Sequence, residues 1–280
     1  MRFTSCLLLT ATAAHTACQG GDDPSNNSTA PADFIFRATS DIQTPSPVTA
    51  ASFVPNSVAS WLGHIILLDA KGTLHRATTD SAETEIVALG RYVDVAGLAR
   101  EKKAGVFLAL TPQGQIKGFI QSDDEGNFSP LAVSQPSESF ERFCVTAKPN
   151  ETVLWAQSSS KSHKLSVEVF DENSVSLSVL EKGADDIDPC KAKPGFSLGA
   201  DHTLSAANNA LTLTAGGKPL SVELTNGLSI GGRSELGYVT GTDANMGSVF
   251  NEGLILAADK NDGRLVLISR SYVLQELEAR

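Results

Sequence analysis

Three acidic clusters are the first candidates for chemistry in this chain of 280 residues. They are Asp123-Asp124-Glu125-Gly126-Asn127, Asp185-Asp186-Ile187-Asp188 and Asp259-Lys260-Asn261-Asp262-Gly263. Calcium binds several carboxylate and carbonyl oxygens, so Asp123, Asp124, Asp186 and Asp188 are candidate calcium ligands. The third cluster lacks the alternate spacing of an EF-hand-type loop, and all three have the composition of solvated turns. We therefore expect turns and no cofactor, with calcium as the metal that these residues would suit.

Cys144 and Cys190 are the cysteines that could form a disulfide. The similar segments C-V-T-A-K-P and C-K-A-K-P begin at these two positions and indicate the same strand in neighbouring repeats. Outside the cytoplasm such a pair can oxidise, and closing a loop of this length would add roughly 3–4 kcal/mol of stability. Two buried free thiols are the alternative. Neither cysteine has the neighbouring histidine that a catalytic thiol needs.

The histidines do not predict a metal site or a catalytic triad. His64, His75, His163 and His202 show no metal-ligand spacing. Asp201-His202 lies beside a serine-rich stretch, but the chain has no G-x-S-x-G motif. We expect packing or surface roles.

The first seventeen residues have the build of a secretory signal peptide: Arg2, an apolar stretch and small residues. This stretch is too short to span a bilayer, which needs about 20 apolar residues. His15-Thr16-Ala17-Cys18 resembles the lipobox of bacterial lipoproteins, with His15 where an aliphatic residue is usual. The resemblance implies cleavage before Cys18 and a lipid such as palmitate on Cys18. The alternative is an ordinary signal peptide and a secreted protein.

Residues 18–32 are rich in Gly, Asp, Asn, Ser and Pro and have no large apolar side chain. Such a segment cannot bury surface against a core and is predicted to be a flexible tether. Gln19 after the lipidation site resembles lipoproteins of the outer membrane that face the periplasm, if the source is Gram-negative. Residues 33–280 remain as one domain.

Short apolar or alternating segments separated by turn residues fill this domain, as in TVLWAQ, KLSVEVF, SVSLSVL and ALTLTA. This pattern predicts β-strands. The final segment, YVLQELEAR, is where a short helix competes with a strand. We therefore expect an all-β fold.

A longer repeat favours a β-propeller. Strand-turn-strand units begin near Ile65, Val106, Val153, Leu204 and Leu254, at intervals of 41 to 51 residues, close to the roughly 40–50 residues of a four-stranded blade. We predict five blades, or six if Asp33–Thr39 and Val48–Val54 recruit more chain, with Phe34–Arg37 completing the last blade. Gly72, Gly114 and Gly263 occupy the equivalent hairpin turn, which needs positive φ. A large β-sandwich and a stacked solenoid are the alternatives.

The order of IILLDAKGTLHRA, RYVDVAGL, FLALTPQGQIKGF and RFCVTAKPNETVLWAQ resembles the bacterial β-propeller phytases over about ninety residues. In that family, acidic residues on one face hold calcium ions and bind phosphate with basic partners. The resemblance implies such roles for Asp69, Lys71 and Asp94. Phe143, however, replaces the small or acidic residue before the cysteine, and the following acidic run is absent.

Composition and motifs limit the function. The net charge of −10 argues against nucleic acid and anionic lipid as partners of a basic face. We expect a membrane-anchored envelope lipoprotein whose non-catalytic propeller binds an envelope protein or the cell wall. A calcium-dependent phytase-like or lactonase-like hydrolase is the alternative. A sugar- or peptide-binding sensor would show aromatic residues on one face.

Overall fold

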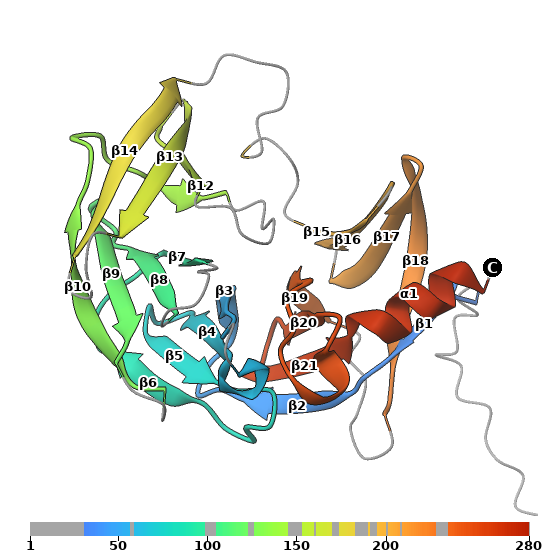
Figure 1. Ribbon diagram of the computed structural model, residues 1–280. Helices are drawn as coiled ribbons and strands as arrows, with labels where there is room; N and C mark the ends of the chain where they lie inside the picture. Colours follow the sequence, from blue (N-terminus) through green and yellow to red (C-terminus); the bar gives the residue numbers. More distant parts are fainter. Residues whose placement is uncertain are drawn as a thin grey trace, which may run out of the picture. The chain divides into compact units, whose positions relative to one another are not determined.

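Strands pair into antiparallel units of four in the computed structural model, and some of these units join or add a strand to form larger sheets (Figure 1). The structure describes residues 31–279 except 57–58, 99–104, 123–125, 145–152, 160, 170–173, 183–189, 191–194, 200, 208 and 228–234. Within these residues five four-stranded units follow one another, and we call each a blade. The first strands of successive blades contact one another: β19 with β3, β3 with β7, β7 with β11 and β15 with β19. The fold is therefore an all-β propeller organisation with five blades.

The blades have the following strands. Blade 1 contains β3 (Val48–Val54), β4 (His64–Asp69), β5 (Leu74–Ala77) and β6 (Glu85–Ala88). Blade 2 contains β7 (Asp94–Leu98), β8 (Val106–Leu110), β9 (Ile116–Gln121) and β10 (Phe128–Ser134). Blade 3 contains β11 (Arg142–Phe143), β12 (Val153–Gln157), β13 (Ser162–Val169) and β14 (Ser174–Lys182). Blade 4 contains β15 (Phe196–Gly199), β16 (His202–Ala207), β17 (Ala210–Ala215) and β18 (Lys218–Thr225). Blade 5 contains β19 (Leu236–Thr242), β20 (Leu254–Asp259), β21 (Arg264–Ser269) and, from the N-terminal part of the chain, β2 (Ser40–Gln43).

The N-terminal strands join two blades, and here one prediction was wrong. Phe34–Arg37, which is β1, does not complete the last blade. It adds a fifth, parallel strand to blade 4 beside β18, and β2 completes blade 5 beside β21. Only Ile42 of the segment SDIQ is buried, so the closing strand gives a weaker pattern than FIFR, in which Phe34 and Phe36 are buried.

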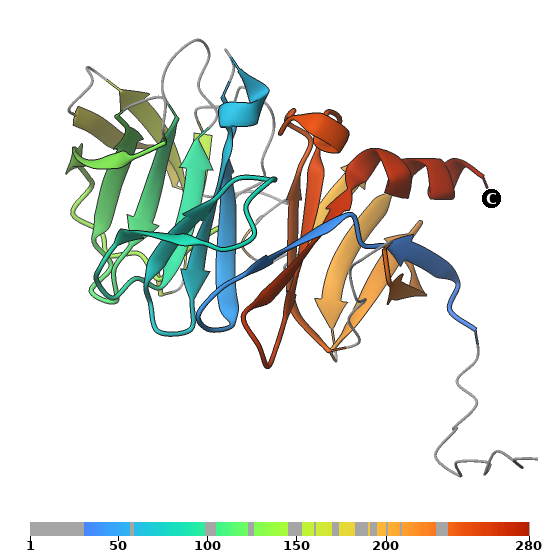
Figure 2. The same ribbon diagram turned by 90° about the horizontal axis from the view of Figure 1, so that it is seen from below.

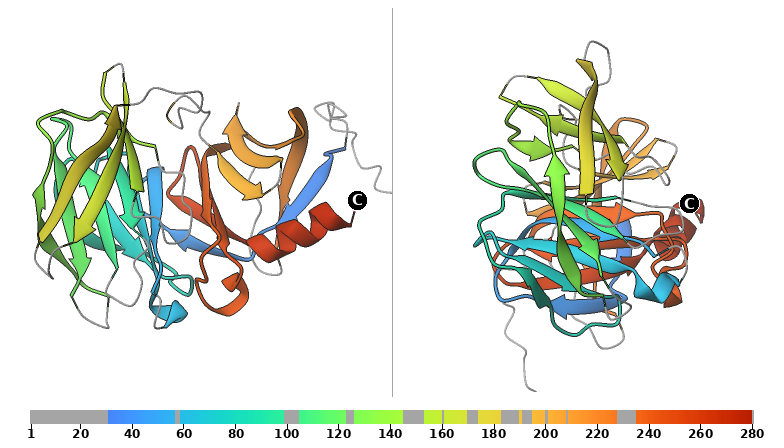
Figure 3. Two further views of the ribbon diagram at one scale, coloured as in Figure 1. Left: turned by 45° about the horizontal axis from the view of Figure 1, so that its top comes forward. Right: turned by 60° about the vertical axis from the view of Figure 1, so that its left-hand side comes forward.

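Blades 2 and 3 share one eight-stranded sheet. Their last strands, β10 and β14, pair in parallel from Ala132 with Ser174 to Ser134 with Ser176. Figure 3 shows these strands in green and yellow as a curled sheet. The sheet folds back on itself, so that the apolar side chains of blade 2 pack against those of blade 3.

Apolar side chains between successive blades form the core. Alternate residues of β4 point to opposite faces, because side chains of a strand alternate: Ile65 and Leu67 pack toward blade 5, and Ile66 and Leu68 toward blade 2. A third cluster lies between blades 4 and 5 and contains Phe36 of β1. Strands buried on both faces explain the unbroken apolar runs in β4, β8 and β20.

The remaining elements are helical. Two short 3-10 turns follow the first strands of blades 1 and 5: η1 (Ser60–Leu62) and η2 (Ser248–Phe250). The chain ends in the helix α1 (Arg270–Glu278), so the last segment is helical rather than extended. Val48–Val54 is the first strand of blade 1, so the described strands form the five predicted blades and not the alternative of six. Among the described residues no helix has the length and apolar character needed to cross a membrane.

The predicted glycine positions have two different explanations. Gly72 and Gly114 adopt φ of 82° and 76°, as the hairpin pattern predicts. Gly263 does not have positive φ in this structure; instead, a Cβ there would lie 1.9 Å from the carbonyl oxygen of Thr44. Close approach of the β2–β3 connection therefore explains Gly263.

Candidate functional site

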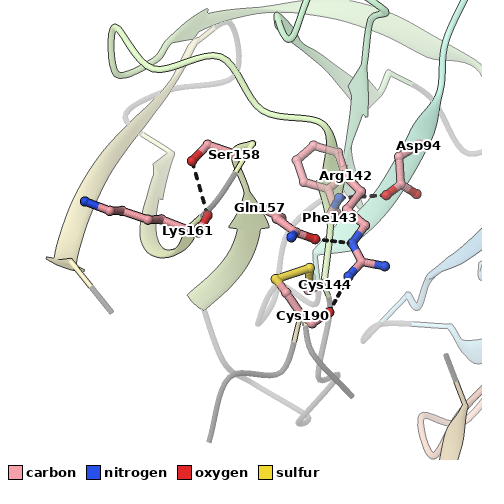
Figure 4. The surroundings of a disulfide bond; sticks show 8 residues. All are labelled: Asp94, Arg142, Phe143, Cys144, Gln157, Ser158, Lys161 and Cys190. Atoms are coloured by element: carbon pink, nitrogen blue, oxygen red, sulfur yellow. Dashed lines mark hydrogen bonds between the residues drawn. A yellow bond between two sulfur atoms is a disulfide. The ribbon is translucent and has the colours of Figure 1, made fainter. Parts of the chain in front are cut away.

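Asp94 links the first strands of blades 2 and 3 (Figure 4). Its Oδ2 accepts a hydrogen bond of 2.6 Å from the Phe143 N–H, and its Oδ1 accepts one of 2.8 Å from the Val95 N–H. β7 and β11 contact each other without ladder pairing in the sheet order. The carboxylate therefore replaces a strand-to-strand hydrogen bond at this junction.

The environment of Asp94 changes its acidity. Burial raises the pKa of Asp94 to about 6, against the lowering effects of the Phe143 and Val95 N–H donors and of the positive charge of Arg142. A carboxyl group with a pKa in this range can exchange a proton near neutral pH, as catalytic acids and bases do. Structural carboxylates also show such shifts, so the pKa alone does not indicate catalysis.

Arg142 is held beside Asp94 by two acceptors. Its Nε donates to the Gln157 side chain over 2.5 Å, and its Nη2 donates to the Cys190 carbonyl oxygen. Gln157 ends β12, directly opposite Arg142 in the strand pairing. Figure 4 shows the guanidinium between these two groups. The arrangement fixes an exposed cation at the point where three segments of the chain meet.

Cys144 and Cys190 form a disulfide bond, with their Cα atoms 5.0 Å apart (Figure 4). The expected pairing is thus present, but the two cysteines do not begin equivalent strands. Cys144 directly follows β11, and Cys190 lies in a turn before β15. The bridge therefore ties blade 3 to the segment that leads into blade 4.

Asp69 stabilises the β4–β5 hairpin. Its Oδ1 accepts hydrogen bonds of 2.9 Å from the N–H groups of Lys71 and Thr73, and its Oδ2 lies 3.1 Å from Nε2 of His75. Burial alone would raise the pKa of Asp69, but the hydrogen bonds outweigh burial and lower it below its ordinary value. An ionised carboxylate saturated by its own hairpin is a structural group. Lys71 contributes its backbone N–H to this turn.

The equivalent hairpin in blade 5 uses the same chemistry. Asp259 Oδ1 accepts from the Asn261 N–H over 2.8 Å, and Asp262 Oδ1 accepts from the Arg264 N–H over 2.8 Å. In blade 2 the hydroxyl of Thr111 accepts from the Gln115 N–H over 3.1 Å. A side-chain oxygen that accepts from the following backbone is typical of such turns. The acidic cluster at 259–263 is therefore a turn, as its composition indicates.

The candidate calcium ligands do not form one cluster in the described structure. Asp123, Asp124, Asp186 and Asp188 lie outside the described residues. Asp69 and Asp94 have separate roles in a hairpin and at a blade junction. Among the described residues no three His, Cys, Asp or Glu side chains gather in a way that could hold a metal ion.

Sequence reasoning missed a serine–histidine pair in the β12–β13 hairpin. The Oγ of Ser158 lies 3.0 Å from Nε2 of His163, and it also donates to the Lys161 carbonyl oxygen over 3.2 Å. A serine hydroxyl has one hydrogen, so when it donates to Lys161 the histidine must donate to Ser158. His163 then braces the turn instead of acting as a base. The only sequence signal is the short spacing in SSSKSH.

Comparison with known proteins adds little to this geometry. No family model and no curated protein matches the chain. Among solved structures, 74% of the chain aligns with the N-terminal domain of Nup159 (12% identity, 62% of that chain, TM-score 0.30). The same share aligns with the gluconolactonase XC5397 from Xanthomonas campestris (9% identity, 68% of that chain, TM-score 0.28). It also aligns with a functionally unknown protein from Desulfotomaculum acetoxidans DSM 771 (12% identity, 62% of that chain, TM-score 0.29). The alignment spans less than two thirds of the first and third of these chains, and likeness of this degree says nothing about ligand or activity.

Proposed function

We propose that this protein is a lipid-anchored envelope protein whose β-propeller acts as a non-catalytic binding or scaffold module. The sequence supports anchorage: a signal-like segment ends directly before Cys18, and a polar tether separates Cys18 from the domain. Gln19 favours the outer membrane, facing the periplasm, as the destination. The partner is an envelope protein or the cell wall.

One observation favours a binding module over a calcium-dependent hydrolase. Asp69 and Asp94 are the acids that the phytase resemblance assigns to a calcium site, and the carboxylate oxygens of both are hydrogen-bonded to the protein itself. A carboxylate that ligates calcium must direct its oxygens to the ion. The Asp69 carboxylate instead stabilises the β4–β5 hairpin, and the Asp94 carboxylate connects blades 2 and 3.

A lactonase-like or phytase-like hydrolase remains the alternative, and the pKa of Asp94 near 6 is the observation that favours it. The purified chain should be incubated with lactones and with phytate, with and without calcium. We expect no hydrolysis above that of the Asp94→Asn variant and no calcium-dependent rise in melting temperature. Turnover that requires calcium and is abolished by Asp94→Asn would replace the binding module with an enzyme.

Anchorage has its own test. Cells that express the full chain should incorporate labelled palmitate into the protein, and Cys18→Ala should abolish both the label and sedimentation with membranes. Cys6→Ala is the matched control, because it changes a cysteine in the same leader. A Cys18→Ala protein that still sediments with membranes would contradict lipid anchorage.

A further inference from the structure

Two exposed apolar side chains occupy equivalent turns in neighbouring blades. Trp61 in η1 is 69% exposed and Val249 in η2 is 42% exposed. Each turn connects the first strand of its blade to the second, β3 to β4 in blade 1 and β19 to β20 in blade 5. Figure 2 shows each turn as a short coil where the first strand ends. Folding leaves both side chains in water, where apolar surface is unfavourable.

Both turns lie at one end of their blades. β5 ends on the side where β3 ends, because β4 runs antiparallel to both. Thr79, two residues after β5, donates its hydroxyl to the Met246 carbonyl oxygen over 3.3 Å. Met246 belongs to the β19–β20 connection, which contains η2. This hydrogen bond therefore joins the loops of blades 1 and 5 at the same end.

The η2 turn is built rigidly. Met246 and Phe250 are 1% and 2% exposed, and the hydroxyl of Ser269 donates to the Val249 carbonyl oxygen over 2.8 Å. Ser248 adopts a positive φ of 48°, which is uncommon for a residue with a side chain. Buried residues on each side of Val249 thus fix the turn that presents it.

The η1 turn is secured in a similar way. The Asn56 side chain accepts from the Ala59 N–H over 3.0 Å, and Ala59 is 8% exposed. In η2 the Asn245 side chain accepts from the Gly247 N–H over 2.9 Å. An apolar side chain held on a fixed turn loses little conformational entropy when it binds. Tryptophan is also among the residue types that contribute most at protein interfaces.

The loops of blades 1 and 5 at this end are acidic. Residues 55–63, 78–84 and 243–253 contain Asp80, Glu83, Asp243 and Glu252 but no Lys or Arg. Asp80, Asp243 and Glu252 are exposed. The nearby Arg270 donates to the carbonyl oxygens of Glu252 and Leu198. Negative loops around apolar tips complement a positively charged partner and disfavour an anionic lipid surface.

We propose that the turns bearing Trp61 and Val249 form a docking surface for a protein with apolar side chains flanked by Lys or Arg. This inference rests on the proposed binding function and names the surface that performs it. The apolar tips supply affinity, and the acidic loops select the partner by charge.

A labelled peptide of alternating leucine and lysine tests the surface. Its fluorescence anisotropy should rise on titration with the purified full chain. Tryptophan emission should shift to shorter wavelength in a Trp155→Phe background, in which Trp61 is the remaining tryptophan. Trp61→Ser and Val249→Ser should each weaken binding by at least about tenfold, as expected for anchor residues. Leu89→Ser is the control for apolar exposure, because Leu89 is 82% exposed after β6, the strand that leads away from this end.

Charge and fold have separate controls. Asp80→Asn combined with Asp243→Asn should weaken binding and reduce its salt dependence, whereas Glu141→Gln combined with Glu168→Gln in and beside blade 3 should not. Melting temperatures should match the wild type, because the substituted side chains are exposed or half-exposed.

Equal binding by Trp61→Ser, equal binding of a leucine–glutamate peptide, or a shift of the Trp61 emission with phosphatidylcholine vesicles would each overturn the inference. Those results would not contradict the proposed function. The proposed function would be contradicted by calcium-dependent hydrolysis or by a Cys18→Ala protein that still sediments with membranes.

Discussion

Blades 2 and 3 are joined differently from blades 4 and 5. Between blades 2 and 3, the last strands pair within one sheet, and Asp94 connects the first strands. Blades 4 and 5 are instead joined by β1 and β2, which come from the opposite end of the sequence. Blades 2 and 3 are thus connected by their own strands, which are neighbours in the sequence. Blades 4 and 5 depend on strands from the N-terminal part of the chain. The two regions should respond differently to changes at the N-terminus and to reduction.

Removing apolar contact from β1 should have the largest effect. Phe36 is 2% exposed in the core between blades 4 and 5, and Phe36→Ala is expected to cost about 3–5 kcal/mol. Chemical denaturation measures this cost, and hydrogen exchange should show faster exchange in β18 than in β10. Ile35→Ala is the control, since Ile35 lies on the other face and is 46% exposed. An equal cost for both variants would contradict the role given to β1.

Loss of the disulfide should have the next largest effect. Cys144→Ser with Cys190→Ser opens a loop with a sequence separation of 46, and a loop of that length predicts a cost of about 3–4 kcal/mol. Denaturation of the double variant, compared with the oxidised wild type, measures this cost, and wild type in reductant should match the double variant. If hydrogen exchange then becomes faster in β18 by as much as in β11 and β12, the region around blade 3 and the connection between blades 4 and 5 are not independent.

The pH dependence of Asp94 and Asp69 should have opposite signs. The pKa of Asp94 is raised from 3.8 to about 6, so its ionisation destabilises the fold as pH rises from about 4 to about 6. Relative to wild type, Asp94→Asn should therefore gain about 1–3 kcal/mol across that window and keep the gain above it. The size of the gain also depends on the hydrogen bonds that the amide keeps.

Asp69 provides the matched comparison. Its pKa is lowered, so the carboxylate stabilises the fold above its ordinary pKa, and this contribution is lost as pH falls through the lowered value. Asp69→Asn should be less stable than wild type at neutral pH, with the difference shrinking in acid. Urea denaturation from pH 3 to pH 8 compares both variants. Parallel pH curves for the two would be inconsistent with their different surroundings.

A single hydroxyl between blades 5 and 1 should have the smallest effect. The Tyr238 hydroxyl bridges the N–H and carbonyl of Ala51 over 3.1 and 3.2 Å. Tyr238→Phe removes this bridge together with the interaction of the hydroxyl with the Thr240 side chain, and it is expected to cost about 1 kcal/mol. Tyr272→Phe serves as control, because Tyr272 is 49% exposed. A loss comparable to that of Phe36→Ala would mean that polar bridges, not apolar packing, hold the blades.

The sequence predicted the local units well and their long-range partners poorly. The predicted unit starts at Val106, Val153 and Leu254 are the first residues of β8, β12 and β20, because turn residues and apolar runs are local signals. The predicted position of β1 in the last blade was wrong, since nothing in the segment FIFR distinguishes the edge of blade 4 from that of blade 5. The β10–β14 pairing likewise depends on how two blades pack.

In the candidate site, too, the local interactions could be predicted from the sequence and the long-range interactions could not. The hairpin role of Asp69 follows from D-x-K-G, a turn pattern, whereas the resemblance to phytases suggested calcium. The link from Asp94 to Phe143 joins residues 49 apart, and no spacing rule predicts it. The Ser158–His163 pair was missed because its members serve a turn and carry no recognised motif.

The strand order also has a consequence for synthesis. β2 lies near the start of the chain, and its partner β21 is more than two hundred residues further on. At roughly 5–20 residues per second, the ribosome reaches Arg264 about 10–45 s after Gln43. During that time β2 has no permanent partner, and blade 5 can close only after β21 has been made.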